Sequence, residues 1–277
     1  MPLDEIDGRV AVVTGAGSGI GRAMVHHYTA EGMAVVAADV DKASLAETVE
    51  GVTAGEVDVV PTDVADAAAV RRLADRAFET FGAVHLLCNN AGVFQAGLSW
   101  TRSREDWDWA FDVNFFGIVH GIDAFVPRMI EGGGPGHVVN TSSVAGFVAA
   151  PMSGPYNVSK VAAFSLTECL AHDLASVGAP IGASVLCPSA IRTGIAGTDR
   201  VRPGGPVEEG DDASVVRTAL AGMTDAGIDP AEVPPIVLDG VRAGDFLIAT
   251  KPSYRDQLSA RFEALLERRL PPTPTVD

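Results

Sequence analysis

The chain has 277 residues, of which 47% are hydrophobic, and this is ample material for the core of one α/β domain. No apolar run approaches the roughly 20 residues needed to cross a bilayer, and a net charge of −16 would repel nucleic acid and anionic membranes. We therefore expect one domain over residues 1–277 with neither a nucleic-acid nor a membrane partner.

Short apolar runs alternate with segments of helical periodicity along the chain. The runs are apolar on both faces, as parallel strands covered by helices on both sides must be. This alternation predicts an α/β Rossmann fold, a doubly wound parallel sheet of about seven strands with helices on both faces. The predicted strands are Val10–Val13, Ala34–Ala38, Val57–Val60, Val84–Cys88, His137–Asn140, Gly182–Cys187 and Phe246–Ala249. The predicted helices include Ile20–Glu31, Ala67–Phe81, Glu105–Ile130 and Tyr156–Val177.

A glycine-rich turn, TGAGSGIG, joins the first strand to the first helix. Glycine allows backbone to approach a pyrophosphate closely, and the N-terminus of the following helix offers free N–H groups and a positive dipole end. The spacing is TGxxxGxG rather than GxGxxG, because positions 20 and 22 are Ile and Arg. The turn predicts these cofactor-binding residues: Thr14, Gly15, Gly17, Ser18, Gly19, Ile20 and Gly21.

Asp39 ends the second predicted strand, 18 residues after Gly21. A carboxylate there can accept hydrogen bonds from both adenosine ribose hydroxyls and would repel a 2′-phosphate, which favours NAD over NADP. The alternative is a helix N-cap, a role that Asp41 could take instead. Position 40 is Val rather than a cation, but Lys42 is near enough to keep NADP open.

Tyr156 and Lys160 are spaced i, i+4, so they share one face of a predicted helix. A nearby ammonium favours the phenolate and would lower the tyrosine pKa, which makes Tyr156 a candidate acid/base. The alternative is an ordinary surface pair. Ser142 and Ser143 follow the fifth strand, and Asn114 lies inside the helix Glu105–Ile130, where asparagine is mildly unfavourable.

Three features break the regular pattern. Pro127 falls late in the third helix and predicts a kink or an early end there. The irregular stretch from Ser189 to about Glu208 is rich in glycine and proline, and a long loop in a compact domain is usually functional or disordered. Residues Pro271–Asp277 are expected to form a frayed tail.

Together these motifs resemble the short-chain dehydrogenase/reductase family, whose members depend on NAD or NADP and carry TGxxxGxG and YxxxK motifs. The match runs from about Gly8 to Arg269 in the family's order. Besides the glycine-rich turn and the Tyr/Lys pair, it includes Asp63-Val64, the NNAG segment Asn89–Gly92, Asn114 and the NTSSVAG segment Asn140–Gly146.

The resemblance implies an NAD-dependent enzyme that acts on CH–OH groups and transfers a hydride between NAD(H) and a secondary alcohol or ketone. Family spacing selects Ser143, which is 13 residues before Tyr156 and three before Gly146, as the serine that holds the substrate oxygen. Tyr156 would be the acid/base, Lys160 would also hold the nicotinamide ribose, and Asn114 would hold a water that links Lys160 to solvent. The implied catalytic set is therefore Asn114, Ser143, Tyr156 and Lys160.

The resemblance also extends the cofactor site. Asp63 would face the adenine ring, with a backbone contact from Val64. Where the family has Pro-Gly after the sixth strand, this chain has Pro188-Ser189, and serine tolerates positive φ poorly, which leaves the form of this turn open. The further implied cofactor-binding residues are Val40, Asp63, Val64, Asn90, Ala91, Gly92, Tyr156, Lys160, Pro188, Ile191 and Thr193.

The family's substrate-covering loop and helices correspond to about residues 189–227, and a mobile lid there could exclude water. Candidate pocket-lining side chains, most of them apolar, predict a mainly hydrophobic substrate, although each candidate could equally belong to ordinary packing. These candidates are Phe94, Gln95, Val144, Phe147 and Met152.

Two other functions remain open. An epimerase or dehydratase would keep the fold and use a bound cofactor without net redox change, and a non-catalytic NAD-binding redox sensor would bind without turnover. Loss of Tyr156, Lys160 or Ser143 would mark the sensor, and none is lost.

Compartment and assembly are expectations of the same kind. The acidic N-terminus lacks a basic region followed by an apolar stretch, and Cys88, Cys169 and Cys187 form no CxxC pair, so we expect a cytoplasmic protein. The scattered histidines show no metal spacing, so no metal is expected. Relatives of this kind imply a homotetramer or homodimer built through the helices Glu105–Ile130 and Tyr156–Val177.

Overall fold

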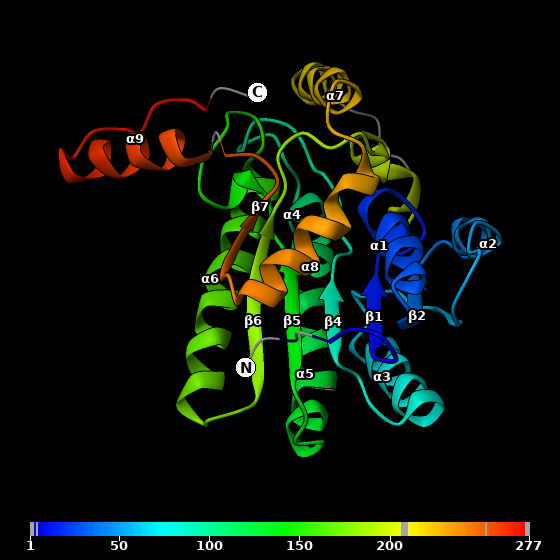
Figure 1. Ribbon diagram of the computed structural model, residues 1–277. Coiled ribbons are helices and arrows are strands. Elements are labelled where there is room, and N and C mark those ends of the chain that lie inside the picture. Colours follow the sequence, from blue (N-terminus) through cyan, green and yellow to red (C-terminus); the bar gives the residue numbers. More distant parts are fainter. Residues whose placement is uncertain (1–2, 4, 206–209, 253, 275–277) are drawn as a thin grey trace.

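The computed structural model describes residues 3, 5–205, 210–252 and 254–274. Its strands form one parallel sheet of seven, in the order β3-β2-β1-β4-β5-β6-β7 (Figure 1). Every predicted strand is present within two residues of its expected bounds, which confirms the predicted fold class. The strands are β1 (Val10–Thr14), β2 (Ala34–Asp39), β3 (Val57–Pro61), β4 (Leu86–Asn89), β5 (Gly136–Thr141), β6 (Ile181–Cys187) and β7 (Leu247–Ala249).

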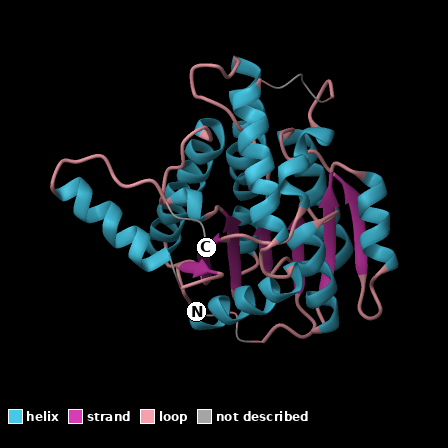
Figure 2. Ribbon diagram, turned by 90° about the horizontal axis from the view of Figure 1, so that it is seen from above, coloured by secondary structure: helices cyan, strands magenta, loops and turns pink. Residues whose placement is uncertain are grey.

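Alternate side chains of each strand point to opposite faces, and the apolar pattern supplies a core to both. In β1, Ala11 and Val13 join one buried cluster with residues of α1 and α8, whereas Val12 joins the cluster on α3, α5 and α6. Figure 2 shows the sheet between these two helix layers. The α-helices are α1 (Gly19–Ala30), α2 (Lys42–Glu50), α3 (Ala67–Phe81), α4 (Arg104–Phe111), α5 (Gly117–Glu131), α6 (Gly154–Ser176), α7 (Asp211–Asp225), α8 (Val233–Ala243) and α9 (Tyr254–Leu266).

The predicted continuous helix Glu105–Ile130 is wrong. It is divided into α4 and α5 by a π-helical turn, η1 (Asp112–Phe116), which inserts the wider i→i+5 hydrogen-bonding pattern. Pro127 does not end the helix either, because α5 continues to Glu131. Asn114 therefore lies in a π-turn, a form of helix that often marks functional sites.

The segment after β6 is more regular than its composition predicts. It forms a 3₁₀ helix, η3 (Gly194–Val201), before α7, and two shorter 3₁₀ turns are η2 (Val144–Gly146) and η4 (Pro230–Glu232). Of the stretch predicted to be irregular, residues 206–208 lie outside the described residues, as do residues 275–277 of the predicted tail.

The C-terminal helix α9 projects from one side of the molecule, beyond β7 at the edge of the sheet (Figures 1 and 2). Residues 271–274 have no regular secondary structure. No helix in the described part of the chain is both long and apolar enough to cross a membrane.

Candidate functional site

One cavity of about 540 Å³ brings together most of the predicted site residues. It lies where the strand order reverses between β1 and β4, at the carboxyl ends of the strands, which is the usual ligand position in a doubly wound sheet. Four predicted residues do not line it: Thr14, Gly17, Gly21 and Asn114. The predicted residues that do line it are Gly15, Ser18, Gly19, Ile20, Asp39, Val40, Asp63, Val64, Asn90, Ala91, Gly92, Ser143, Tyr156, Lys160, Pro188, Ile191 and Thr193.

The glycine-rich turn is held tightly against the segment that follows β4. Gly15 has φ +67°, and a Cβ there would lie 2.8 Å from the Cα of Ala91. Thr14 Oγ1 accepts hydrogen bonds from the backbone N–H groups of Asn90 (2.9 Å) and Ala91 (3.1 Å). A Cβ at Gly21 would overlap the carbonyl oxygen of Gly15. Thr14 and Gly21 therefore shape the turn from behind rather than face the cavity.

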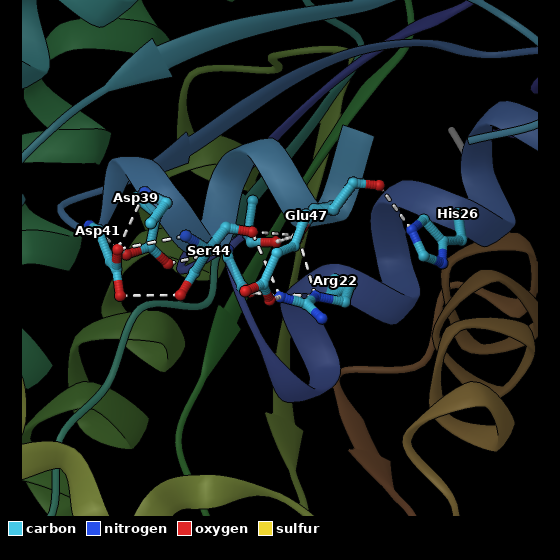
Figure 3. Close-up of polar contacts among 10 residues, drawn as sticks. Arg22, His26, Asp39, Asp41, Ser44 and Glu47 are labelled. Carbon is cyan, nitrogen blue, oxygen red and sulfur yellow. Dashed lines mark hydrogen bonds and ion pairs between the residues drawn. The ribbon is translucent and has the colours of Figure 1, made fainter. Parts of the chain in front are cut away.

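Asp39 and Asp41 have separate roles (Figure 3). Asp41 caps α2, because its Oδ1 accepts from the N–H groups of Ala43 (3.1 Å) and Ser44 (3.2 Å). The Asp39 carboxylate instead accepts from the N–H groups of Gly17 (2.9 Å) and Asp41 (2.9 Å). The alternative that Asp39 is the N-cap is thus wrong, and its carboxylate faces the cavity beside the glycine-rich turn.

Arg22, the cation closest in sequence to that turn, is directed toward α2 (Figure 3). Its Nη2 donates to the carbonyl of Gly17 (2.6 Å) and to Glu47 Oε2 (2.9 Å), and its Nε donates to Thr48 Oγ1 (3.0 Å). These bonds hold the turn and α2 together. Arg22 does not line the cavity.

The remaining predicted cofactor residues come from several loops. Asp63 Oδ1 accepts from the N–H of Ala65 (2.9 Å), which forms a tight turn after β3. A Cβ at Gly19 would lie 2.9 Å from the methyl carbon of Thr193. The segment after β6 therefore packs directly on the N-terminus of α1.

Ser189 does not strain the turn that it occupies. Among the described residues other than glycine, only Met152 and Arg268 have positive φ, so the uncertainty that serine introduced is removed. The Ser189 N–H donates to Thr250 Oγ1 (3.0 Å), which ties this turn to the residue after β7.

Ser143, Tyr156 and Lys160 meet at the end of β5. The Lys160 Nζ donates to the carbonyl oxygen of Thr141 (3.0 Å) and lies 5.8 Å from the centroid of the Tyr156 ring. The side chains of Ser143 and Tyr156 lie close enough to interact. Ser142 faces elsewhere, as expected, and donates to the carbonyl of Lys160 (2.7 Å) in α6.

Burial dominates the electrostatics of these groups. Burial raises the pKa of Tyr156, and the hydrogen bond from Ser143 opposes that rise. Burial also lowers the pKa of Lys160 to about 8. The prediction that the tyrosine pKa is lowered is therefore wrong for the chain by itself, because burial raises it and the Lys160 amine is directed at Thr141.

Asn114 lies behind the cavity and is fully buried. Its Oδ1 accepts from the N–H of Val93 (2.8 Å), and its Nδ2 donates to the Val93 carbonyl (2.9 Å) and Ser159 Oγ (3.0 Å). A Cβ at Gly92 would lie 3.2 Å from Lys160 Nζ and 3.4 Å from Asn114 Oδ1. Because Gly92 has no side chain, a narrow space remains between the Lys160 amine and the Asn114 amide.

Several contacts at the site have no clear signal in the sequence. Thr198 Oγ1 accepts from the N–H of Phe94 (2.9 Å), and the Phe94 ring lies 4.8 Å from the Tyr156 ring. Thr273 and Pro274, assigned to a frayed tail, line the cavity. Ser159 lies within the YNVSK motif, which was the one available indication of its role.

The other end of the cavity is mainly apolar. Phe94 and Val144 line it as predicted, but Gln95, Phe147 and Met152 do not. Gln95 and Phe147 are buried elsewhere, and Met152 is exposed. Further apolar lining residues are Trp109, Val113, Val148, Ile195, Val216, Leu220 and Met223.

Comparisons with known proteins agree with this fold. The sequence model of the short chain dehydrogenase family matches residues 9–202. A C alpha-dehydrogenase of Sphingobium is 32% identical over 280 residues, which cover 97% of this chain and 89% of the relative. A 1-deoxy-11-beta-hydroxypentalenate dehydrogenase of Streptomyces avermitilis is 41% identical over 187 residues, covering 66% of this chain and 68% of that protein. The crystal structure of a short chain dehydrogenase/reductase from Burkholderia phymatum in complex with NAD superimposes with a TM-score of 0.95 at 41% identity, over 99% of both chains.

Proposed function

The chain belongs to the short-chain dehydrogenase/reductase family and is a nicotinamide-dependent oxidoreductase, and we propose that it interconverts apolar secondary alcohols and ketones with NAD(H). One observation carries the proposal: Ser143, Tyr156 and Lys160 line the same cavity as the glycine-rich turn and Asp39. A dinucleotide bound along the turn would therefore have its reactive end beside the tyrosine.

The residues present fit a nicotinamide dinucleotide. The cradle at Gly15 has no room for a Cβ, so a backbone surface is open to phosphate at the N-terminus of α1. The Asp39 carboxylate lines the adjoining part of the cavity, where it would accept bonds from ribose hydroxyls and repel a 2′-phosphate. We propose NAD as the cofactor for this reason. The nicotinamide ring, when bound, would accept or supply the hydride.

The chain's own residues would manage the proton and the substrate oxygen. Tyr156 would take the proton from an alcohol or return it to a ketone, and the Ser143 hydroxyl would hold the same oxygen. Lys160, held by Thr141, would orient the ribose and supply positive charge near the phenol. Asn114, beside the space at Gly92, would hold a water that links the Lys160 amine to solvent.

The apolar end of the cavity supports a hydrophobic substrate, because α7 contributes Val216, Leu220 and Met223 to it and no carboxylate. We propose that about residues 189–227 form the substrate-covering segment of a single domain, 1–277. We also propose that copies associate as a dimer or tetramer through the half-exposed apolar side chains of α6, Val158 and Val161.

A screen of apolar alcohols and ketones with NAD(H) and NADP(H), followed at the nicotinamide absorbance band, tests the reaction. Turnover with a net absorbance change supports the proposed function. Turnover without that change would favour the epimerase or dehydratase alternative. Tight cofactor binding with no turnover of any substrate would favour the redox sensor.

We predict that Asp39→Asn reduces the preference for NADH over NADPH by on the order of tenfold, because one repelling charge near the 2′ position is removed. The amide keeps an oxygen near the N–H of Gly17, so the turn should persist. Dissociation constants for both cofactors, measured by fluorescence titration, give the preference. Asp123→Asn removes an equal charge from an exposed position on α5 and should change nothing. A wild-type preference for NADPH would remove the basis of the assignment.

A further inference from the structure

The part of the cavity beside the glycine-rich turn has little positive charge to meet two phosphates. Asp39 and Asp63 line it, and Arg22 is occupied with Gly17 and α2. Among the described residues that line the cavity, the cations are Lys160, Arg200 and Lys251. Lys160 is hydrogen-bonded to the Thr141 carbonyl. Lys251 follows β7, which lies four strands away from β1 and the glycine-rich turn. Arg200 is therefore the cation whose surroundings need an explanation.

Arg200 lies near the C-terminal end of η3 and is exposed. Its Nη1 donates to the carbonyl of Gly197 (3.1 Å) in the same short helix. Within the described parts of the chain, no carboxylate lies within ion-pair distance of it. Arg200 lines the same cavity as Gly15, Ser18 and Gly19 of the glycine-rich turn. Thr193, the residue before η3, packs on Gly19 at the N-terminus of α1, so η3 begins beside the turn.

We propose that Arg200 is a cofactor-binding residue that pairs with the pyrophosphate of the dinucleotide and so holds η3 against it. The proposal rests on the proposed function, because it requires a dinucleotide in this cavity. A guanidinium fork matches phosphate oxygens in geometry and charge. The pyrophosphate is the better partner than a 2′-phosphate, because the Asp39 carboxylate lines the cavity and would repel a 2′-phosphate at the ribose end.

The same short helix, η3, is connected to the proposed catalytic tyrosine, Tyr156, through contacts of Phe94. Thr198, two residues before Arg200, accepts the hydrogen bond from Phe94 N–H, and the Phe94 ring packs on Tyr156. A phosphate contact at Arg200 would therefore fix the wall of the substrate end as well. We expect substrate to bind more tightly to the cofactor complex than to the free protein.

Calorimetric titration of the full chain with NADH, NADPH, ADP-ribose and adenosine tests the assignment. Arg200→Gln should weaken the first three ligands about tenfold, as expected for loss of one charge-assisted hydrogen bond, and should leave adenosine unchanged. The salt dependence of NADH binding should also fall. Arg200→Lys keeps the positive charge but lacks the two-pronged guanidinium, so its affinity for NADH should lie between those of the wild type and Arg200→Gln. Arg71→Gln, an equal loss of charge on the exposed face of α3, is the matched control.

Two outcomes overturn the inference. Unchanged binding of all four ligands by Arg200→Gln would show that the side chain has no phosphate partner. Weakening confined to NADPH would place it at the 2′-phosphate instead. If the wild-type chain binds neither NADH nor NADPH, the proposed function itself fails. If the wild type binds NADH and Arg200→Gln binds it equally well, only the inference about Arg200 fails.

Discussion

Tyr156→Phe should lower kcat by about 10²–10⁴-fold, the usual contribution of a positioned proton donor, while the dissociation constant for NADH stays nearly the same. The substitution removes only the hydroxyl, and the ring can keep its packing against Phe94. Ser143 would still hold the substrate oxygen, so KM should change less than kcat. Steady-state kinetics with the best substrate of the screen and a fluorescence titration with NADH give the two quantities.

Tyr28→Phe is the matched control for this prediction. Tyr28 is fully buried in α1, and its hydroxyl lies 3.9 Å from the sulfur of Cys88, away from the cavity. Tyr28→Phe also removes one buried phenol oxygen, but at a position outside the cavity, so kcat should stay close to the wild-type value. Activity of Tyr156→Phe equal to that of the wild type would refute the proposed acid/base.

The sequence predicts the layers of the fold and the contents of the cavity because these follow from short-range patterns. Strands that are buried on both faces must be apolar throughout, so each run marks a strand. The topological reversal beside β1 then places the residues after β1, β2 and β4 at one crevice. Tyr156 and Lys160 share a helix face at i, i+4 spacing.

The features that the sequence did not predict depend on tertiary contacts. The π-turn at Asp112–Phe116 widens one turn of a helix whose composition gives no sign of it. Asn114 in this turn donates hydrogen bonds to the Val93 carbonyl and to Ser159 Oγ. The bond between Thr198 and Phe94 joins residues 104 positions apart. Burial, which spacing along a helix does not reveal, is what raises the pKa of Tyr156.

Lys160→Met should lower the rate of alcohol oxidation at neutral pH by on the order of 10²-fold, because the phenol loses both a nearby positive charge and the group proposed to orient the ribose. A positive charge favours the phenolate, so its removal should raise the pKa of Tyr156 further. The acidic limb of the pH profile for oxidation should then move to higher pH. Ketone reduction needs the protonated phenol and should lose less at neutral pH. Profiles of kcat/KM against pH in both directions give the asymmetry.

The free energy of unfolding provides a second measurement that is independent of catalysis. Lys160 has a folded pKa of about 8 against an ordinary value of 10.5, so between these values the unfolded chain binds more protons at this site. Its contribution to stability therefore rises as pH increases through that window. Lys160→Met should abolish this rise, whereas Arg71→Met, at an exposed site on α3, should retain it. Denaturant titrations across the window would contradict the burial argument if both variants kept the wild-type slope, because the amine would then be solvated in the folded protein.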